Sequence, residues 1–416
     1  MGRPANDAGA AAAEAAGARR PTRRFEAKRN AIVRSAIEEM NRKGVRGMTL
    51  GDVAARLDLV PTGVIYYFRN KEELAAAAFL KGIETYQGLL GEAGREATAD
   101  ERLAAFLRAW FDHAARVGRG EADVLPVYSD VRALNAPAVN TAYVDMFRGF
   151  RRLLPGQETL PRLHRNARAH LLLSQVLWIC AWQHQVEPAD YPRTAERMIA
   201  ILTQGLLGRG TSWTTPRPLD LSRDPGAAAS AEPFLRAATQ LINDEGYHGA
   251  SVERISARLN VSKGAFYHHN ETKDELVVGC FQRTFDLMWG AIHAAEREGG
   301  SGRDVLVSAV SALIEHQMSG QAPLLRTSAL SAVPEAIRLG LLQRFDRISY
   351  RFASILCDGI ADGSVAPVDV NIASQTITTA INAAAELHYW TPGLAAQDVI
   401  AHYVRPLFEG LVSPAA

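Results

Sequence analysis

The residues of this 416-residue chain that could do chemistry are not spaced as a catalytic site. The sequence has no H-E-x-x-H, G-x-S-x-G or P-loop pattern, and no G-x-G-x-x-G that follows a strand. Its cysteines, Cys180, Cys280 and Cys357, are far apart and form no C-x-x-C pair. They predict reduced thiols, and neither a zinc site nor a disulfide framework. We therefore expect no enzyme activity, no cofactor and no metal.

Basic residues are concentrated near the start of the chain. The net charge is only +1, so any affinity for nucleic acid must come from local patches. One patch sets seven basic residues against a single acid, Glu26. Its members are Arg19, Arg20, Arg23, Arg24, Lys28, Arg29 and Arg34. Their chemistry suits contacts with phosphate groups.

A long internal repeat is the most informative feature of the sequence. The segments Ile32–Leu74 and Phe234–Leu276 lie 202 residues apart and align without a gap. A solenoid unit is shorter, about 20–50 residues. The repeat has the length of a complete two-part protomer, which predicts a dimer fused into one polypeptide. Eleven of the 43 aligned positions are identical: Arg34/Arg236, Ala36/Ala238, Asn41/Asn243, Gly44/Gly246, Gly47/Gly249, Ala55/Ala257, Arg56/Arg258, Leu57/Leu259, Lys71/Lys273, Glu73/Glu275 and Leu74/Leu276.

Each copy of the repeat predicts a helix-turn-helix. A first helix ends at a glycine, Gly44 or Gly246, where a helix end needs a left-handed backbone. Thr49 or Ser251 then supplies the N-cap hydroxyl of a second helix. A short turn and a third short helix follow. In such a motif the recognition helix lies in the major groove of DNA.

The rest of the chain predicts helices. Apolar residues recur at helical spacing without sustained alternation, so the expected fold class is all-α. Each half should carry a three-helix DNA-binding unit followed by a larger helical domain. The predicted organisation is a disordered tail (1–18), a DNA-binding domain with a basic arm (19–77), a larger helical domain (78–207), a linker (208–231), a second DNA-binding domain (232–279) and a second larger helical domain (280–416).

The recognition segments carry a family resemblance. The run LNVSKGAFYHHNETKDEL at 259–276, and the run LDLVPTGVIYYFRNKEEL at 57–74, resemble the TetR family of transcriptional repressors. The resemblance covers roughly 45 residues of each copy. The first copy departs from the family pattern at Val60, Pro61 and Ile65, and the second departs at Asn270.

The resemblance implies two sets of DNA contacts. The expected phosphate contacts are Thr49, Tyr66, Tyr67, Lys71, Ser251, Tyr267 and Lys273, with Ser262 as the hydroxyl at the start of the second recognition helix. The expected base contacts are Thr62, Tyr66, Lys263, Gly264 and His268, with Lys263 suited to guanine. We further expect the Arg19–Arg29 arm, including Arg23 and Arg24, to enter the minor groove. A solvated, disordered charge run is the alternative.

Aromatic and histidine side chains are candidates for a ligand pocket in the helical domains. The candidates are Trp110, His113, Tyr128, Tyr143, Trp178, Trp182, Trp289, His316 and Tyr389. Taken singly, each aromatic residue suits a core position equally well. His113 and His316 lie at matching places beside a carboxylate, and a structural role is favoured for them over a ligand or metal role.

The family resemblance implies a ligand-responsive repressor that binds a double-stranded DNA operator and a small-molecule effector. It also implies that the larger helical domains, 78–207 and 280–416, are the ligand-binding and dimerisation domains. Helices within Leu171–Trp182, Ile199–Leu207, Ile372–Leu387 and Val399–Leu411 are expected to form a four-helix bundle inside one chain. The recognition segments Pro61–Phe68 and Lys263–Asn270 differ, so this pseudo-dimer should prefer an asymmetric operator.

Three alternatives stay open. Two fused chains could pair on a longer palindrome, as a homodimer. The protein could also be a small-molecule sensor that acts through a protein partner, with one or both helix-turn-helix units vestigial. An unrecognised helical enzyme is the least favoured. A cytoplasmic protein without a membrane segment is expected, because the most apolar stretch, Leu171–Trp182, is interrupted and short.

Overall fold

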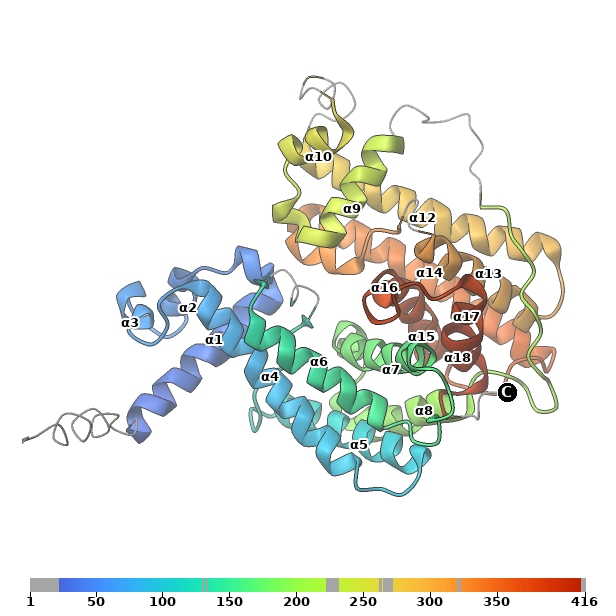
Figure 1. The fold of residues 1–416 in the computed structure, drawn as a ribbon, viewed down its shortest axis with the longest axis horizontal. Coiled ribbons are helices and arrows are strands. Elements are labelled where there is room, and N and C mark those ends of the chain that lie inside the picture. Colours follow the sequence, from blue (N-terminus) through green and yellow to red (C-terminus); the bar gives the residue numbers. More distant parts are fainter. Residues whose placement is uncertain are drawn as a thin grey trace, which may run out of the picture.

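The computed structural model describes residues 22–128, 131, 134–221, 232–261, 264, 272–319 and 323–412. Within these residues the fold is all-α, as predicted, and one isolated bridge joins Leu207 to Val365 (Figure 1). We call residues 22–207 the first half and residues 232–412 the second half. No helix in the described part combines the length and the apolar character needed to cross a bilayer.

The first half consists of a small N-terminal unit and a larger helical domain. Its helices are α1 (Arg23–Gly47), α2 (Leu50–Ala55), α3 (Pro61–Ile65), α4 (Lys71–Ala93), α5 (Ala99–Gly118), α6 (Pro137–Arg152), α7 (Arg162–Trp182) and α8 (Tyr191–Gln204), with short 3₁₀ turns at Gln183–Gln185 and Pro188–Asp190.

The second half follows the same order up to its last segment. Its helices are α9 (Glu232–Gly249), α10 (Val252–Leu259), α12 (Lys273–Glu298), α13 (Gly302–Met318), α14 (Glu335–Ala361), α15 (Val370–Ala383), α16 (Leu387–Trp390), α17 (Ala396–Val399) and α18 (Arg405–Glu409). The 3₁₀ segments η4 (Thr327–Ala332) and η5 (Ala384–Glu386) and a π-helical turn at Ile400–Val404 connect them.

Glycines and hydroxyl caps lie at the predicted helix ends in the described residues of both DNA-binding units. Gly44 and Gly246 interrupt α1 and α9 with φ of 71° and 74°, a conformation in which a β-carbon is strained. The Thr49 hydroxyl accepts the N–H of Asp52, and the Ser251 hydroxyl accepts that of Arg254. The turn that follows α2 or α10 also contains one residue in the left-handed conformation, and in neither copy is that residue a glycine. Asp58 has φ of 51° and Asn260 has φ of 54°.

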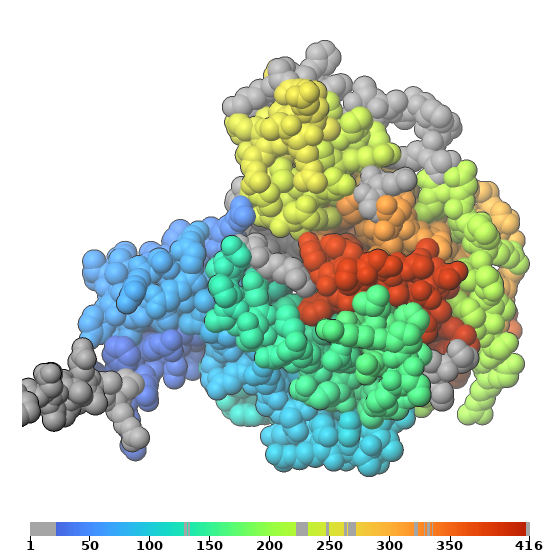
Figure 2. Space-filling view, in the orientation of Figure 1, coloured from blue at the N-terminus to red at the C-terminus, as the bar shows by residue number. Residues whose placement is uncertain are grey.

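The two halves meet along their C-terminal helices. We call the contact of α7 and α8 with α15–α18 the seam. Helix α7 packs on α15 (Figure 1), and three of the α7 side chains donate hydrogen bonds across the seam to backbone oxygens. These bonds are Asn166 Nδ2 to Trp390 O (2.9 Å), His170 Nε2 to Ala383 O (2.9 Å) and Gln175 Nε2 to Thr376 O (3.0 Å). In the space-filling view the C-terminal helices lie directly on the first half (Figure 2).

The ends of α8 and α18 cross each other reciprocally. The N–H of Leu206 donates to Phe408 O (2.7 Å), and the N–H of Leu411 donates to Leu202 O (2.8 Å). The glycines before them, Gly205 and Gly410, have φ of 77° and 99°. A contact that each half makes with the other through equivalent residues is the arrangement of a two-fold dimer interface.

Two predicted boundaries change in detail. The boundaries at 77 and 279 fall inside α4 and α12, so each of these helices belongs to both the DNA-binding unit and the larger domain. The linker is not a free tether over residues 209–221. Arg217 donates its N–H to Ser308 Oγ (3.2 Å) and its guanidinium to Gly299 O (3.0 Å), and Trp213 packs on Phe408. The predicted tail and residues 222–231 lie outside the described part.

Candidate DNA-binding interface and ligand cavity

Helix α3 has one exposed face, which carries the predicted base contacts of the first copy. Thr62 and Tyr66 are exposed and lie one helical turn apart, so their side chains share that face. Tyr66 is 75% exposed, whereas Val64 and Phe68 are buried in the core of the unit. Val60 caps α3 without a side-chain hydrogen bond and Pro61 begins it, which is favourable because the first helical N–H needs no partner.

The first turn of α1 lies beside the end of α3. The Phe25 ring centroid is 4.8 Å from that of Tyr67 and 6.1 Å from that of Tyr66. Arg23 and Arg24 are exposed in this turn. Thr22 caps a helix here, so the part of the predicted basic arm from Arg23 onward is the start of α1. Its entry into the minor groove stays a prediction. Positions 19–21 lie outside the described residues.

The expected phosphate ligands also have contacts within the protein. The Thr49 hydroxyl donates to Asp52 Oδ2 (2.8 Å), and Lys43 Nζ lies 2.9 Å from the same carboxylate. Lys71 Nζ, in the first turn of α4, donates to Arg46 O (3.1 Å). That bond leaves other ammonium hydrogens of Lys71 for a phosphate oxygen.

The second unit places its equivalent residues in the same way where it is described. Ser251 caps α10, and Lys273 begins α12 behind the capping box of Thr272 and Glu275. Burial lowers the pKa of the Lys273 ammonium. Gly264 is exposed and helical. The predicted contacts Ser262, Lys263, Tyr267 and His268, and the family departure at Asn270, lie outside the described residues.

The two helix-start lysines give a prediction for salt dependence. Removing one phosphate contact should reduce the steepness of log affinity against log salt by about 0.9. We expect Lys71→Gln combined with Lys273→Gln to reduce that steepness by about 1.8, and to weaken operator binding, in fluorescence anisotropy titrations. Lys81→Gln is the matched control, because Lys81 lies further along α4 and pairs with Glu84. If the slope of log affinity against log salt is unchanged in the double variant, neither lysine contacts a phosphate in the complex.

A cavity of about 360 Å³ lies between the first DNA-binding unit and the seam. This volume is at the lower end of the range for small-molecule sites, about 300–1,000 Å³. Three of the predicted pocket residues, Tyr128, Tyr143 and Trp178, line it. The complete lining is Met40, Asn41, Gly44, Val45, Val127, Tyr128, Tyr143, His170, Leu173, Ser174, Leu177, Trp178, Cys180, Ala181, Arg326, Thr327, Thr379, Asn382, Ala383 and Glu386.

The structure does not bring the other six predicted pocket residues to this cavity. Trp110 and Trp182 are buried in the core of the first half, where Trp110 donates to the Tyr86 hydroxyl (3.2 Å). His113, on α5, contacts Asp123 O and does not line the cavity. Their packing partners come from within one half, whereas the cavity forms between elements of both halves. The remaining three are Trp289 and His316, on α12 and α13, and Tyr389, which is 41% exposed and packs on His388.

Two asparagines that are not among the predicted site residues, Asn41 and Asn243, each connect one DNA-binding unit to its helical domain. Asn41 Nδ2 donates to Leu125 O (2.9 Å), and its Oδ1 accepts the N–H of Val127 (2.9 Å). We call this pair of bonds the first clamp. The sequence signal was present, because Asn41 and Asn243 are identical positions of the repeat.

One group of potential metal ligands occurs among the described residues. His164, Asp398 and His402 place ligand atoms within 4.8 Å of one another across the seam, and these residues could hold a divalent cation. The two imidazole rings are stacked at 3.9 Å, and His164 Nε2 lies 3.7 Å from Asp398. No sequence pattern points to this group, because His164 is more than 200 residues from the other two members.

His113 should make folding sensitive to acid. Its Nε2–H donates to Asp123 O (3.1 Å), and burial lowers the pKa of the ring below its ordinary value. In the unfolded chain the His113 ring takes up a second proton near pH 6.5, whereas in the folded chain it does so only at a lower pH. The neutral ring therefore contributes its full stabilisation of the fold above pH 6.5, and this contribution is lost as the pH falls. We expect the unfolding free energy of His113→Gln to fall less between pH 7.5 and 5.5 than that of the unmodified chain. Exposed His184→Gln is the control, and equal pH slopes would contradict the assignment.

Comparison with known proteins agrees with the two DNA-binding units. Residues 32–78 and 234–280 both match the family model of bacterial regulatory proteins of the tetR family. The transcriptional activator FasR of Mycolicibacterium smegmatis is 36% identical over 90 residues, which are 21% of this chain and 41% of FasR. The repressor KstR2 of the same species is 25% identical over 199 residues, 44% of this chain and 91% of KstR2.

Solved structures give matches of similar extent. The TetR-family regulator PfmR from Thermus thermophilus aligns with 43% of this chain and 98% of its own length, with 22% identity and a TM-score of 0.36. KstR2 matches less than half of the chain, while the family's DNA-binding domain is found twice in it, 202 residues apart. The chain thus carries the DNA-binding domain of the bacterial tetR-family regulators twice, at residues 32–78 and 234–280.

Proposed function

We propose that this chain is a ligand-responsive transcriptional repressor that acts as an intramolecular pseudo-dimer on an asymmetric operator. The observation that carries the proposal is the reciprocal seam. Leu206 and Leu411 each donate to the opposite half, and α7 bonds to α15 and to Trp390 through three side chains. A homodimeric regulator makes such an interface between two chains, whereas here one chain supplies both sides.

The asymmetry of the operator follows from the recognition segments. A homodimer reads a palindrome because its two recognition helices are identical. Here the exposed Thr62 and Tyr66 of α3 correspond to Gly264 and His268 of the second copy. Different side chains select different base edges, so the two half-sites should differ in sequence while lying about one DNA turn, roughly 34 Å, apart.

Ligand response is supported by the cavity between the first DNA-binding unit and the seam. A small molecule bound there controls DNA binding only if its affinity differs between the conformations that fit and do not fit the operator. The cavity reaches both the DNA-binding helix α1 and the seam, so an occupant contacts the parts that must move relative to each other. Repression rather than activation is the proposed sign of regulation, although the matched relatives include one of each.

A footprint of the purified chain on DNA upstream of its own gene tests the proposal. The salt concentration is held at 150 mM, since affinity depends strongly on salt. Light scattering of the complex gives the number of chains bound. We expect one chain to protect two unlike half-sites, and a reporter gene downstream to be less active in the presence of the protein.

Other outcomes identify the alternatives. Two identical half-sites bound by one chain within a single turn would rule out the asymmetric operator. Two chains on a longer palindrome would move the functional dimer to an interface between chains. The absence of specific protection on genomic DNA fragments would favour the second candidate, a small-molecule sensor with vestigial helix-turn-helix units. That candidate is motivated by the departures from the family pattern at Val60, Ile65 and Asn270, of which Val60 caps α3 without a side-chain bond.

A further inference from the structure

The first clamp has an equivalent in the second half. Asn243 Nδ2 donates to Leu324 O (2.9 Å), and Asn243 Oδ1 accepts the N–H of Arg326 (3.0 Å). We call these bonds the second clamp. Each clamp joins the first helix of a DNA-binding unit, α1 or α9, to the loop that follows α5 or α13. Both clamps therefore tie the orientation of a DNA-binding unit to the position of a loop in the helical domain.

The cavity borders both clamps. Asn41 and Val127 of the first clamp line it, and so does Arg326 of the second. The next residue of each loop, Tyr128 or Thr327, also lines it. Equivalent residues of the two loops thus face one shared space, and helix α1 contributes Met40, Gly44 and Val45 to the same wall.

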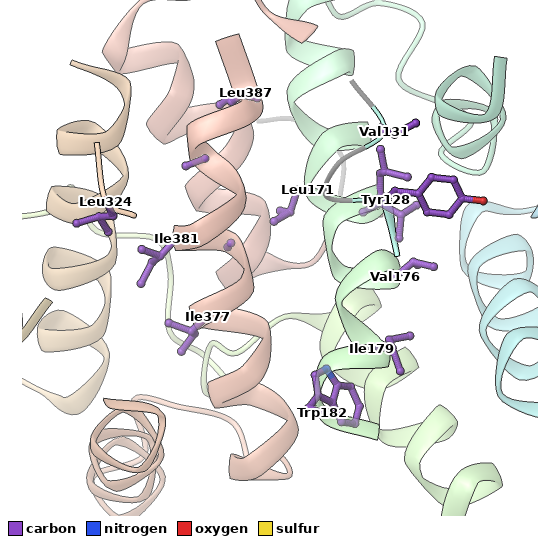
Figure 3. Close-up of a cluster of buried hydrophobic side chains, with 14 of the residues drawn as sticks. Tyr128, Val131, Leu171, Val176, Ile179, Trp182, Leu324, Ile377, Ile381 and Leu387 are labelled. Carbon is purple, nitrogen blue, oxygen red and sulfur yellow. The ribbon is translucent and has the colours of Figure 1, made fainter. Parts of the chain in front are cut away.

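Small side chains on the facing helices keep this space open. In the close-up, Val176 and Ile179 of α7 point into the first half, while Ile377 and Ile381 of α15 point into the second (Figure 3). These four large apolar side chains are therefore used in separate cores and do not fill the space between the two helices. Ser174 and Ala181 of α7 and Thr379 and Ala383 of α15 line the cavity between them.

The walls define the class of molecule that fits. Apolar contacts come mainly from Leu173, Leu177 and Trp178 together with the Tyr143 ring. The lining contains one pair of charged side chains, Arg326 and Glu386. They form an ion pair at 3.2 Å, so their charges neutralise each other. An ionic ligand would have no opposite charge to replace its hydration, so burying it would be costly. A neutral, largely apolar molecule with an aromatic or fused ring system matches these walls.

We infer that the chain binds one such molecule at this shared cavity, and that the molecule acts on both DNA-binding units through the two clamps. The inference rests on the proposed function, since it identifies the effector site of a ligand-responsive regulator. It also assigns one effector to each chain. An occupant that contacts both loops limits their motion and thereby fixes the relative orientation of the two recognition helices.

Binding of Prodan, a neutral fluorescent naphthalene, tests the site without DNA. We expect saturable binding with one Prodan per full-length chain. Ser174→Phe and Ala181→Phe fill the cavity and should weaken binding at least tenfold. Ser174→Ala is the matched control, because it leaves the cavity open, and should change affinity less than threefold. Thermal melting shows whether each variant is folded; Ala181 is exposed at the edge of the cavity and tolerates a larger side chain most easily.

Hydrogen exchange tests the coupling. The amides of Val127 and Arg326 donate to the two asparagines, so saturating Prodan should slow exchange at least threefold in peptides that contain each of them. Asn41→Ala should remove this effect at Val127 while Prodan still binds, and Asn243→Ala should do the same at Arg326. Two Prodan molecules per chain, unchanged binding in both filled variants, or slowing at one loop alone would overturn the inference. If Prodan binds and slows exchange as expected but the chain protects no DNA, the proposed function is contradicted and the inference about the cavity still holds.

Discussion

Replacing Gly410 by alanine is expected to open the seam and strongly destabilise the fold. The residue has φ of 99°, and a β-carbon there would lie 2.1 Å from Thr203 O. Gly205 is equally constrained, since its β-carbon would lie 2.1 Å from Phe408 O. The backbone oxygens cannot rotate away as side chains do, so the ends of α8 and α18 must separate. We expect either substitution to cost about 3 kcal/mol or more of unfolding free energy.

Equilibrium unfolding in urea measures this cost. Gly88→Ala is the matched control, because Gly88 lies inside α4 and a β-carbon there meets no atom within 4 Å. The control should be stabilising by about 0.5–1 kcal/mol, since alanine restricts the unfolded chain and favours the helix. Wild-type stability in both Gly205→Ala and Gly410→Ala would mean that the reciprocal crossing does not hold the halves together.

Truncating the exposed face of α3 is expected to abolish contact with one half-site and preserve contact with the other. Thr62 and Tyr66 lie on the same exposed face of the α3 segment, while Val64 and Phe68 are buried and pack this segment on the core of the unit. A good base contact is worth about 1–3 kcal/mol, so Thr62→Ala with Tyr66→Ala should weaken operator binding at least about tenfold. The fold should persist, because neither side chain is buried.

Footprinting and competition titration of this double variant separate the two recognition helices. Protection should disappear from one half-site only, because the second copy carries different recognition residues. Tyr350→Ala serves as the control, since Tyr350 is 68% exposed on α14 in the second half. Equal loss at both half-sites would indicate that α3 does not have a half-site of its own, and unchanged affinity would exclude its exposed face from DNA contact.

Much of the DNA-binding unit could be predicted from the sequence, because its determinants are local. Gly44 and Gly246 end a helix through their own backbone freedom, and Thr49 and Ser251 each cap a helix through an amide three residues away. Interactions of this range need no knowledge of the rest of the fold. Repetition of the pattern 202 residues later made the interpretation specific.

The start of α1 was harder to predict because a charge run carries no structural signal of its own. Arg23 and Arg24 were interpreted as part of a basic arm, whereas Thr22 caps a helix that begins at Arg23, and Phe25 packs on Tyr67. The aromatic candidates show the same limit. Periodicity places Trp110 on an apolar helix face but does not distinguish a core position from a pocket position.

The sequence by itself determined an all-α chain with two helix-turn-helix units, since helix ends, caps and apolar periodicity are encoded within a few residues. Only the tertiary structure decided that Gly205 and Gly410 cross, and that Asn41, Ser174 and Arg326 border one cavity. These contacts join segments more than 100 residues apart. Their geometry depends on how whole helices pack side by side, and no local pattern in the sequence fixes that packing.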